Sequence, residues 1–215
     1  MANKLPVKQK TKVTRIAQNE NSTWQISLDN SETLKAKQLV LTLPLIQALD
    51  LCYRSGIIPS DKTVTFFNQQ KYHPCISLLV ASDADSMIPE PGGMWFDDQN
   101  AIRWAADNKK KGISKTTAIT VHISPEMSNK WYDDSEEAIF SNLDSQLKEL
   151  IPGNWVHKSI HKWRYSQPTN IVDLGYLNDE YYKNLWFTGD VFLNGRVESA
   201  WLAGLRTAQA LKTKI

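Results

Sequence analysis

The first third of the chain alternates between apolar and polar positions in patterns typical of strands. This alternation predicts strands over residues 5–16 and 22–28, with a turn at 19–21 between them. The continuous apolar run 38–43 ends before a proline and predicts a strand that is buried on both faces. A 3.6-residue repeat over 45–52 then predicts a short helix. These elements indicate a sheet region followed by its first helix.

The middle of the chain has the pattern of an antiparallel sheet. Strands are predicted over 75–81 and 117–123, and a hairpin is predicted from 94–96 and 102–106 around a polar turn. A long strand follows over 156–165 and is broken before Pro168.

Helix-start signals stand between the last two of these strands. Ser124 followed by Pro125 predicts a capped helix start. A second start is expected at Asp134, where Glu137 completes a variant of the capping box, and this helix is expected to run to Leu150.

The end of the chain combines a buried strand, a Gly-Asp turn and an amphipathic helix. The strand is Leu185–Phe187, and the turn is Gly189-Asp190. A strand that leads through glycine to a helix N-terminus exposes backbone N–H groups and a dipole that favour anions. An ordinary strand–loop–helix with a turn aspartate is the alternative. The apolar stripe of the helix consists of Val197, Ala200, Trp201, Gly204, Leu205, Ala208 and Leu211.

Composition narrows the class of protein. Apolar residues make up 41% and charged residues 22% of 215 residues, which is typical of a globular chain. A net charge of +2 is too small to indicate a nucleic-acid groove. Cys52 and Cys75 have no metal-ligand spacing, so we expect reduced thiols, no metal site and a cytoplasmic location. No apolar stretch reaches the ~18 residues of a membrane span, and residues 1–12 lack the apolar core of a secretory signal.

The order of these elements predicts an α+β (α/β) chain in two parts. Residues 1–55 and 168–215 are expected to pack together, and residues 56–167 are expected to form an inserted lobe on an antiparallel sheet.

Five segments resemble, in order, the C-terminal two-thirds of the renalase-like branch of FAD-dependent amine oxidases. They are Leu39–Leu49, Ile102–Gly112, His122–Ser128, His161–Pro168 and Gly189–Glu198. The resemblance implies a partial FAD/NAD(P)-binding domain, residues 1–55 with 168–215, and a substrate-binding lobe, residues 56–167. It also implies hydride transfer from an amine or a reduced nicotinamide-type substrate to FAD, with oxygen reoxidising the flavin.

The resemblance assigns residues to two sites and leaves the catalytic residues unknown. By resemblance, the cofactor-binding residues are Val13, Gly189, Asp190, Gly195, Arg196, Val197 and Glu198. The substrate-binding residues are Trp104, Trp163, Arg164 and Tyr165. Flat aromatic side chains stack on planar ligands, but a strand with Trp163 and Tyr165 on its core face explains them equally well.

The chain departs from the family at the phosphate-binding loop. Family members begin with a strand, a G-x-G-x-x-G loop and a helix that hold the FAD pyrophosphate, and none of the nine glycines here forms a G-x-G. Ser199 stands where the family usually has glycine. We therefore expect a partial oxidoreductase that binds FAD weakly and acts on a small-molecule substrate. As its partner we expect either an N-terminal half that carries the G-x-G-x-x-G loop or a second copy of the chain, through self-association.

Two other functions fit the same residues. One is a non-catalytic fragment or split-gene module that binds a partner chain and holds no cofactor. The other is a small-molecule binding protein without flavin. In the partial-oxidoreductase case, three surfaces are expected to lack a cover: the strands Leu39–Leu43 and Leu185–Phe187, and the helix stripe with Trp201 and Leu205.

Overall fold

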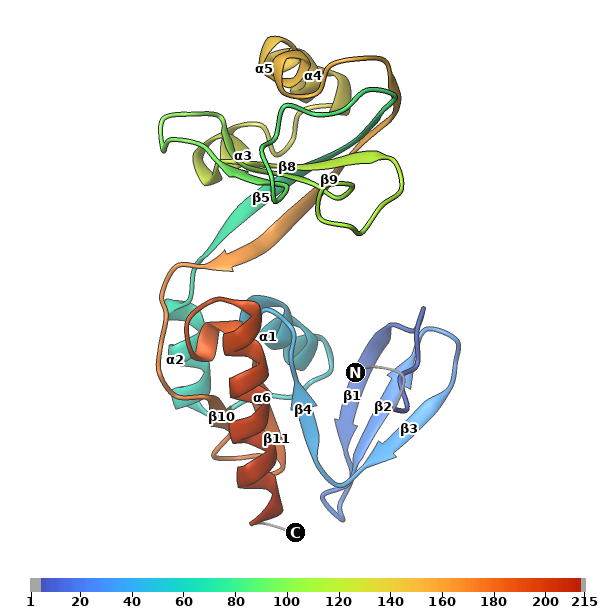
Figure 1. Ribbon diagram of the computed structural model, residues 1–215. Helices are drawn as coiled ribbons and strands as arrows, with labels where there is room; N and C mark the ends of the chain where they lie inside the picture. Colours follow the sequence, from blue (N-terminus) through green and yellow to red (C-terminus); the bar gives the residue numbers. More distant parts are fainter. Residues whose placement is uncertain (1–4, 214–215) are drawn as a thin grey trace. The chain divides into compact units, whose positions relative to one another are not determined.

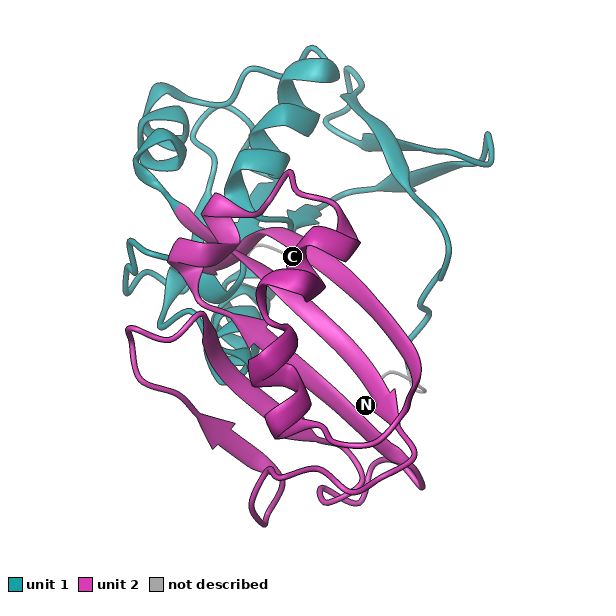
Figure 2. Cartoon of the chain, turned by 90° about the horizontal axis from the view of Figure 1, so that it is seen from above, with its two compact units in different colours: residues 1–71, 168–215 teal, residues 72–167 magenta. Residues whose placement is uncertain are grey.

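The computed structural model describes residues 5–213 and has an α+β fold of two compact units (Figure 1). Unit 1 combines the chain up to residue 71 with the chain from 168 onward, and unit 2 is the continuous stretch 72–167 (Figure 2). The first boundary therefore lies after Lys71 and not after residue 55. The reason is the helix over residues 61–69, whose Phe67 is buried in the core of unit 1 against Phe187.

Unit 1 contains two three-stranded sheets and their helices. Its elements are β1 (Val13–Gln18), β2 (Trp24–Leu28), β3 (Thr33–Ala36), β4 (Leu39–Leu41), α1 (Leu45–Arg54), α2 (Asp61–Gln69), β10 (Tyr176–Asn178), β11 (Leu185–Thr188), η2 (Asp190–Phe192) and α6 (Val197–Lys212). The first sheet is antiparallel, in the order β1-β2-β3. The second has the order β10-β11-β4, and its β11 and β4 are parallel.

Unit 2 is a five-stranded sheet in the order β6-β7-β8-β5-β9 with helices packed on one face. Its elements are β5 (Tyr72–Ser82), β6 (Gly93–Trp95), β7 (Ile102–Asp107), β8 (Thr117–Ile123), α3 (Pro125–Lys130), α4 (Glu136–Asn142), α5 (Asp144–Leu150) and β9 (Trp155–Pro168). Alternate residues of the strands, such as Leu78 and Val121, share a core with Phe140 and Leu147 of the helices. The other face of the sheet has no helix over it within the described residues.

Most elements expected from the sequence form, and the differences have local causes. Ser124 caps α3 as predicted, with its Oγ accepting from the Met127 N–H. The second start was placed one residue early: Ser135 caps α4 and accepts from the Ala138 N–H, while Leu143 interrupts the run to Leu150 with a non-helical conformation. β3, α2 and β10 were not predicted from the sequence.

Burial contradicts two expectations in unit 1. The strand β4 is not buried on both faces, because Leu39 and Val40 are only half-buried and Leu43 beyond it is 40% exposed. The strand β11 is fully buried rather than uncovered, since β10 and β4 flank both of its edges. Along α6 it is the small residues Ser199, Ala203 and Thr207 that are buried.

The predicted apolar stripe of α6 lies largely in solvent. Val197 is 90%, Trp201 57% and Leu205 43% exposed. The small residues on the other face allow α6 to pack closely on the sheet, and Ala203 shares the core with Leu41. The prediction that Trp201 and Leu205 form an uncovered surface is therefore confirmed.

Candidate functional site

The parallel pair β4 and β11 brings two strand ends together at one edge of the small sheet. Leu39 lies opposite Leu185, and Leu41 lies opposite Phe187. Because the strands run the same way, their carboxyl ends meet at the same edge, where α1 follows β4 and α6 follows β11 after η2. Ligands of open α/β sheets bind outside the carboxyl ends of such strands.

Both helices begin at this edge without a side-chain cap. Pro44 at the start of α1 and Arg196 at the start of α6 make no capping hydrogen bond. Glu198 is the acidic residue in the first turn of α6, and the first turn of α1 has none. The partial positive charge of the helix dipoles at their N-termini makes this edge attractive to an anion or an electron-rich ring.

Gly189 directly follows β11, beside the end of β4, and leaves open space there. Its backbone has φ 155° and ψ −170°, a region that is nearly restricted to glycine. A Cβ built there would meet only the carbonyl oxygen of Thr42, at 4.0 Å. The position is therefore conformationally demanding but sterically open, with the end of β4 directly beside it.

We expect Gly189→Ala to lower the free energy of unfolding by about 1–3 kcal/mol through backbone strain, since the added methyl meets no close neighbour. Gly204→Ala is the matched control, because Gly204 lies inside α6 and a Cβ added to it would meet nothing within 4 Å. That variant should be unchanged or stabilised by up to about 1 kcal/mol. Urea unfolding of both variants measures the difference, and equal stabilities would contradict the strain at Gly189.

The turn after Gly189 is held by Asp190. Its Oδ1 accepts from the Val191 N–H at 2.9 Å, and its carbonyl oxygen accepts from Leu193 N and Gly195 N. Gly195 has φ 64° and packs against Pro168, whose Cγ would lie 3.2 Å from an added Cβ. Asp190 thus organises η2 through local capping, which is the ordinary role that the sequence left open as an alternative.

Arg196, Val197 and Glu198 are exposed at the start of α6. The structure thus places residues 189–198 along one continuous path from strand end to helix start. Val13 is assigned by resemblance to the same site, and it lies on β1 in the wall of a groove.

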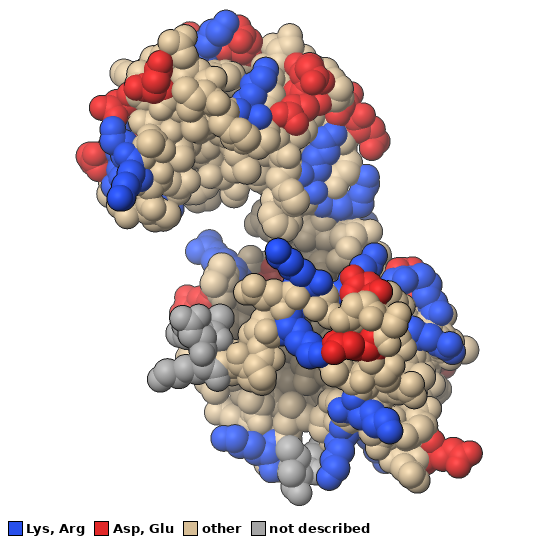
Figure 3. All heavy atoms as spheres, turned by 90° about the vertical axis from the view of Figure 1, so that its right-hand side faces the viewer, with Lys and Arg blue, Asp and Glu red and all other residues tan. Residues whose placement is uncertain are grey.

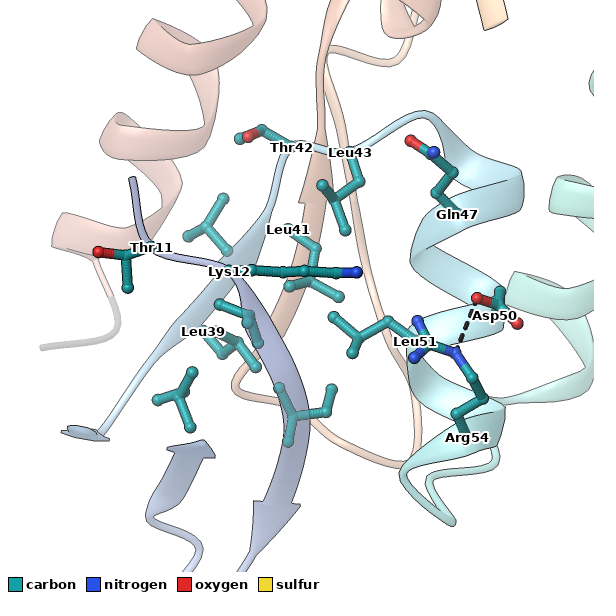
Figure 4. A pocket seen from close by; sticks show the side chains of 14 residues that line it. Thr11, Lys12, Leu39, Leu41, Thr42, Leu43, Gln47, Asp50, Leu51 and Arg54 are labelled. Atoms are coloured by element: carbon teal, nitrogen blue, oxygen red, sulfur yellow. Dashed lines mark hydrogen bonds and ion pairs between the residues drawn. The ribbon is translucent and has the colours of Figure 1, made fainter. Parts of the chain in front are cut away.

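This groove, about 630 Å³ in volume, runs along β4 on the side away from β11 (Figure 4). We call it the edge groove. Its walls come from β1, β2, β4 and α1, with an Arg54–Asp50 ion pair of 2.8 Å among the lining residues. It is lined by Thr11, Lys12, Val13, Ile16, Ile26, Leu39, Val40, Leu41, Thr42, Leu43, Gln47, Asp50, Leu51 and Arg54. Thr42 lines the edge groove, and its carbonyl oxygen is also the nearest atom to a Cβ built at Gly189.

In unit 2, two of the four expected substrate residues lie on the helix-free face of the sheet. Trp104 lies beside Trp95 on one side and His122 on the other, with ring centroids 6.4 and 5.0 Å apart. Burial lowers the pKa of His122 from its usual 6.5. On β9, Ile160 packs into the helix-side core, so Trp163 points the other way and is 54% exposed.

The other two expected substrate-binding residues, Arg164 and Tyr165, pack against tyrosines elsewhere in the chain. The Arg164 guanidinium stacks 3.9 Å from the centroid of the Tyr132 ring, in the connection between α3 and α4. Tyr165 packs edge-on against Tyr72 at 5.8 Å. Sequence reasoning missed Trp95 and His122 as neighbours of Trp104. The cross-strand register of the predicted hairpin and of the strand 117–123 was the signal that could have found them.

Metal-ligating groups of three or more His, Cys, Asp or Glu side chains do not occur among the residues that the structure describes. No helix in the described part of the chain is long and apolar enough to cross a membrane. Both cysteines are free thiols, and burial raises the pKa of Cys52 to about 12.

The family model for flavin-containing amine oxidoreductases matches residues 1–212. The chain belongs to this family.

Solved structures share the fold of this family member at low sequence identity. A protein of Exiguobacterium sp. that is provisionally described as a protoporphyrinogen oxidase has TM-score 0.68 and 12% identity, over 95% of this chain and 47% of that one. Cyclohexylamine oxidase from Brevibacterium oxydans has TM-score 0.65 and 14% identity, over 94% and 48%. Putrescine oxidase bound to putrescine has TM-score 0.62 and 15% identity, over 94% and 48%. The chain thus spans about half the length of these structures.

The residues of this family member fit part of a flavin. The sterically open Gly189 and the uncapped start of α6 suit the close approach of a flat, electron-rich ring. No G-x-G-x-x-G loop is present in the sequence, so these 215 residues offer no comparable cradle for a pyrophosphate.

Proposed function

We propose that this chain supplies the C-terminal part of an FAD site and the substrate-binding unit of a flavin-dependent oxidoreductase of the renalase-like branch. The observation that carries the proposal is the convergence of two helix N-termini on the strand ends beside Gly189. The bound flavin would accept a hydride from an amine or a reduced nicotinamide-type substrate. The chain would act in the cytoplasm, which suits its two free thiols.

In this proposal, residues 189–198 of unit 1 orient the flavin. The start of α6 favours the negative charge that develops on a reduced flavin, because its N–H groups and dipole point toward the strand ends. Gly189 lets the backbone approach the ring, and Val13 in the edge groove contacts the adenine end by main-chain atoms. Asp190 holds η2 in place through Val191 and Gly195, so its role is to position the turn.

Unit 2 would hold the substrate on the helix-free face of its sheet. Trp95, Trp104 and Trp163 offer flat apolar surfaces on which a planar group can stack. His122 is kept neutral near pH 7 by its lowered pKa and can accept or donate one hydrogen bond there. We assign no general base, since hydride transfer from an amine needs only a neutral amine and a well-placed acceptor.

The alternative is a non-catalytic module that binds a partner and holds no flavin. The face in Figure 3 carries interspersed positive and negative side chains, which fits a small-molecule or protein partner better than a nucleic acid. Measuring whether a flavin binds at the ends of β4 and β11 distinguishes the oxidoreductase function from the non-catalytic one.

The test maps flavin binding on the ¹⁵N-labelled chain by amide chemical shifts. FMN at millimolar concentration should shift the amides of residues 189–198 and 42–47, whereas inorganic phosphate at the same concentration should shift them much less. Arg196→Glu should weaken FMN binding about three- to tenfold, because it places a negative charge at the helix start. Lys212→Glu makes the same change in net charge at the far end of α6 and should have no effect. Shifts outside these segments, or none, would favour the non-catalytic alternative.

A further inference from the structure

A second pocket of unit 1 lies at the opposite end of the small sheet from Gly189. The parallel strands β4 and β11 begin at Leu39 and Leu185, and the residues just before each strand line this pocket. Its volume is about 710 Å³, within the ~300–1,000 Å³ of pockets that bind small molecules. We call it the turn pocket. It is lined by Gln18, Asn21, Ser22, Thr23, Lys37, Gln38, Tyr181, Tyr182, Lys183 and Asn184.

Asn184 holds three turns of the turn pocket together. Its Nδ2 donates to the carbonyl oxygens of Ser22 and Lys37, and its Oδ1 accepts from Gln18 Nε2 at 2.7 Å. These bonds join the β1–β2, β3–β4 and β10–β11 connections, of which the last is far from the other two in the sequence. The walls of the pocket are therefore preformed, which lowers the entropic cost of binding a ligand.

The turn pocket carries positive charge without a matching negative charge. Lys37 and Lys183 are exposed, and neither forms an ion pair with a residue that the structure describes. Two acidic residues adjoin the lining in the sequence: Glu20 lies in the β1–β2 turn outside the lining, and Glu180 pairs with Lys62 at 3.0 Å. The pocket therefore favours an anionic ligand.

Beside the lysines, the turn pocket offers a flat ring and amide groups with unused hydrogen-bonding atoms. Tyr181 is 65% exposed, and such a ring can stack on a planar ligand. The Oε1 of Gln38 accepts from Trp186 Nε1, so its Nε2 remains a donor without a partner among the described residues. The Nε2 of Gln18 is used within the pocket wall, which leaves its Oε1 as an acceptor. A donor and an acceptor in one pocket suit the edge of a nitrogenous ring.

We propose that the turn pocket binds a nucleoside phosphate. The base would stack on Tyr181 and hydrogen-bond to the amide side chains, and the phosphate would pair with Lys37 and Lys183. A phosphate ion would use only the lysines, and an uncharged ring would leave them unpaired, so a ligand with both groups fits the lining best. This inference goes beyond the proposed function, because the turn pocket lies at the amino ends of β4 and β11 and the proposed flavin site lies at their carboxyl ends.

The test titrates AMP, adenosine and ribose 5-phosphate separately into the ¹⁵N-labelled chain. AMP has a base and a phosphate, and each of the other two compounds lacks one of them. We expect AMP to bind with a dissociation constant below about 1 mM and to shift the amides of residues 18–23, 37–38 and 181–184. Adenosine and ribose 5-phosphate should each bind at least about fivefold more weakly, because stacking and charge pairing each contribute to the affinity.

Variants at two exposed residues of the turn pocket separate stacking from charge pairing. Tyr181→Ala should weaken AMP binding at least about fivefold and leave ribose 5-phosphate binding unchanged, whereas Tyr181→Phe should keep both. Lys183→Glu should weaken the binding of AMP and of ribose 5-phosphate about three- to tenfold and leave adenosine binding unchanged. Lys115→Glu is the matched control, because it makes the same change in net charge at an exposed lysine of unit 2, and it should have no effect.

Four results would overturn the inference. Equal affinity for AMP and ribose 5-phosphate would make the turn pocket an anion site without a base contact. Equal affinity for AMP and adenosine would show that the lysines bind no phosphate. AMP shifts confined to residues 11–16 and 39–54 would place the ligand in the edge groove. Absence of binding at millimolar AMP would exclude a nucleotide site.

The FMN map of the proposed flavin site is kept separate from this test. FMN also carries a ring and a phosphate, so the map is repeated with saturating AMP. The added AMP should remove any FMN shifts at the turn pocket and leave those at residues 189–198. Failure of the turn pocket and failure of the proposed function are therefore distinguishable.

Discussion

Purified alone, the 215-residue chain should be colourless and should bind FAD about three to six orders of magnitude more weakly than a flavoenzyme with a complete phosphate-binding loop. Such a loop and its helix give the pyrophosphate at least three charge-assisted hydrogen bonds, worth ~1.5–3 kcal/mol each. Their loss amounts to ~4.5–9 kcal/mol, and each ~1.4 kcal/mol is a factor of ten in affinity. The sequence holds no G-x-G arrangement to replace them.

Equilibrium dialysis with FAD and riboflavin measures this effect and contains its own control. Riboflavin has the ring but neither the pyrophosphate nor the adenine, so its dissociation constant should lie within about threefold of that of FAD if neither group finds a strong partner. A yellow chain that retains one FAD per molecule after dialysis would show that other groups of the chain hold the pyrophosphate.

Asp179→Ala should destabilise the chain by about 3–5 kcal/mol. The Asp179 carboxylate is 1% exposed. It accepts hydrogen bonds from Ser60 N–H and Oγ, from Thr63 Oγ1, and from the N–H groups of Tyr181 and Tyr182. It therefore ties the start of α2 to the turn between β10 and β11, and its removal leaves several buried donors without an acceptor. Urea unfolding at pH 7 gives the loss directly.

The same carboxylate makes stability depend on acid pH. Burial acts to raise the pKa of Asp179, but the hydrogen bonds from Thr63, Tyr182 and Ser60 outweigh it and hold the pKa below the usual 3.8. A pKa that is lower in the folded state gives stability that is complete above about pH 3.8 and is lost as the pH falls through the folded-state value. The stability difference between the native chain and Asp179→Asn should therefore shrink below pH 3.8.

Asp61→Asn is the control, because Asp61 is exposed in the first turn of the same helix α2. It should cost less than about 1 kcal/mol, the usual size of a charge–dipole interaction at a helix start. A stability difference for Asp179→Asn that stays constant from pH 7 to pH 3 would show that the charge on Asp179 contributes nothing to its hydrogen bonds.

Several features were predictable because local sequence determines them. Ser124 caps α3 through a hydrogen bond to Met127, three residues away, and such a contact needs no knowledge of the rest of the chain. Residues 117–123 alternate between buried and half-buried positions along β8, as their sequence pattern predicts. The resemblance to amine oxidases was also carried by short segments, and the family match over residues 1–212 confirmed it at the level of the family.

The candidate site could be predicted only in part. The strand, the Gly189-Asp190 turn and the start of α6 follow one another in the chain, so the sequence placed them together. The end of β4 joins them only through parallel pairing with β11, across more than a hundred residues of intervening chain. Likewise, Trp95 and His122 become neighbours of Trp104 through the register of β6, β7 and β8.

By itself, the sequence determined most of the strands and helices and the residue that caps α3, since short-range hydrogen bonds and side-chain periodicity set these properties. The resemblance to the family came from its short motif segments. Tertiary structure alone decided which face of α6 is buried. Periodicity groups Val197, Trp201 and Leu205 on one side, but close packing on the sheet selects the smaller Ser199, Ala203 and Thr207. It alone also decided that Gln18 meets Asn184 and that Ser60 meets Asp179, because both depend on contacts between residues far apart in the chain.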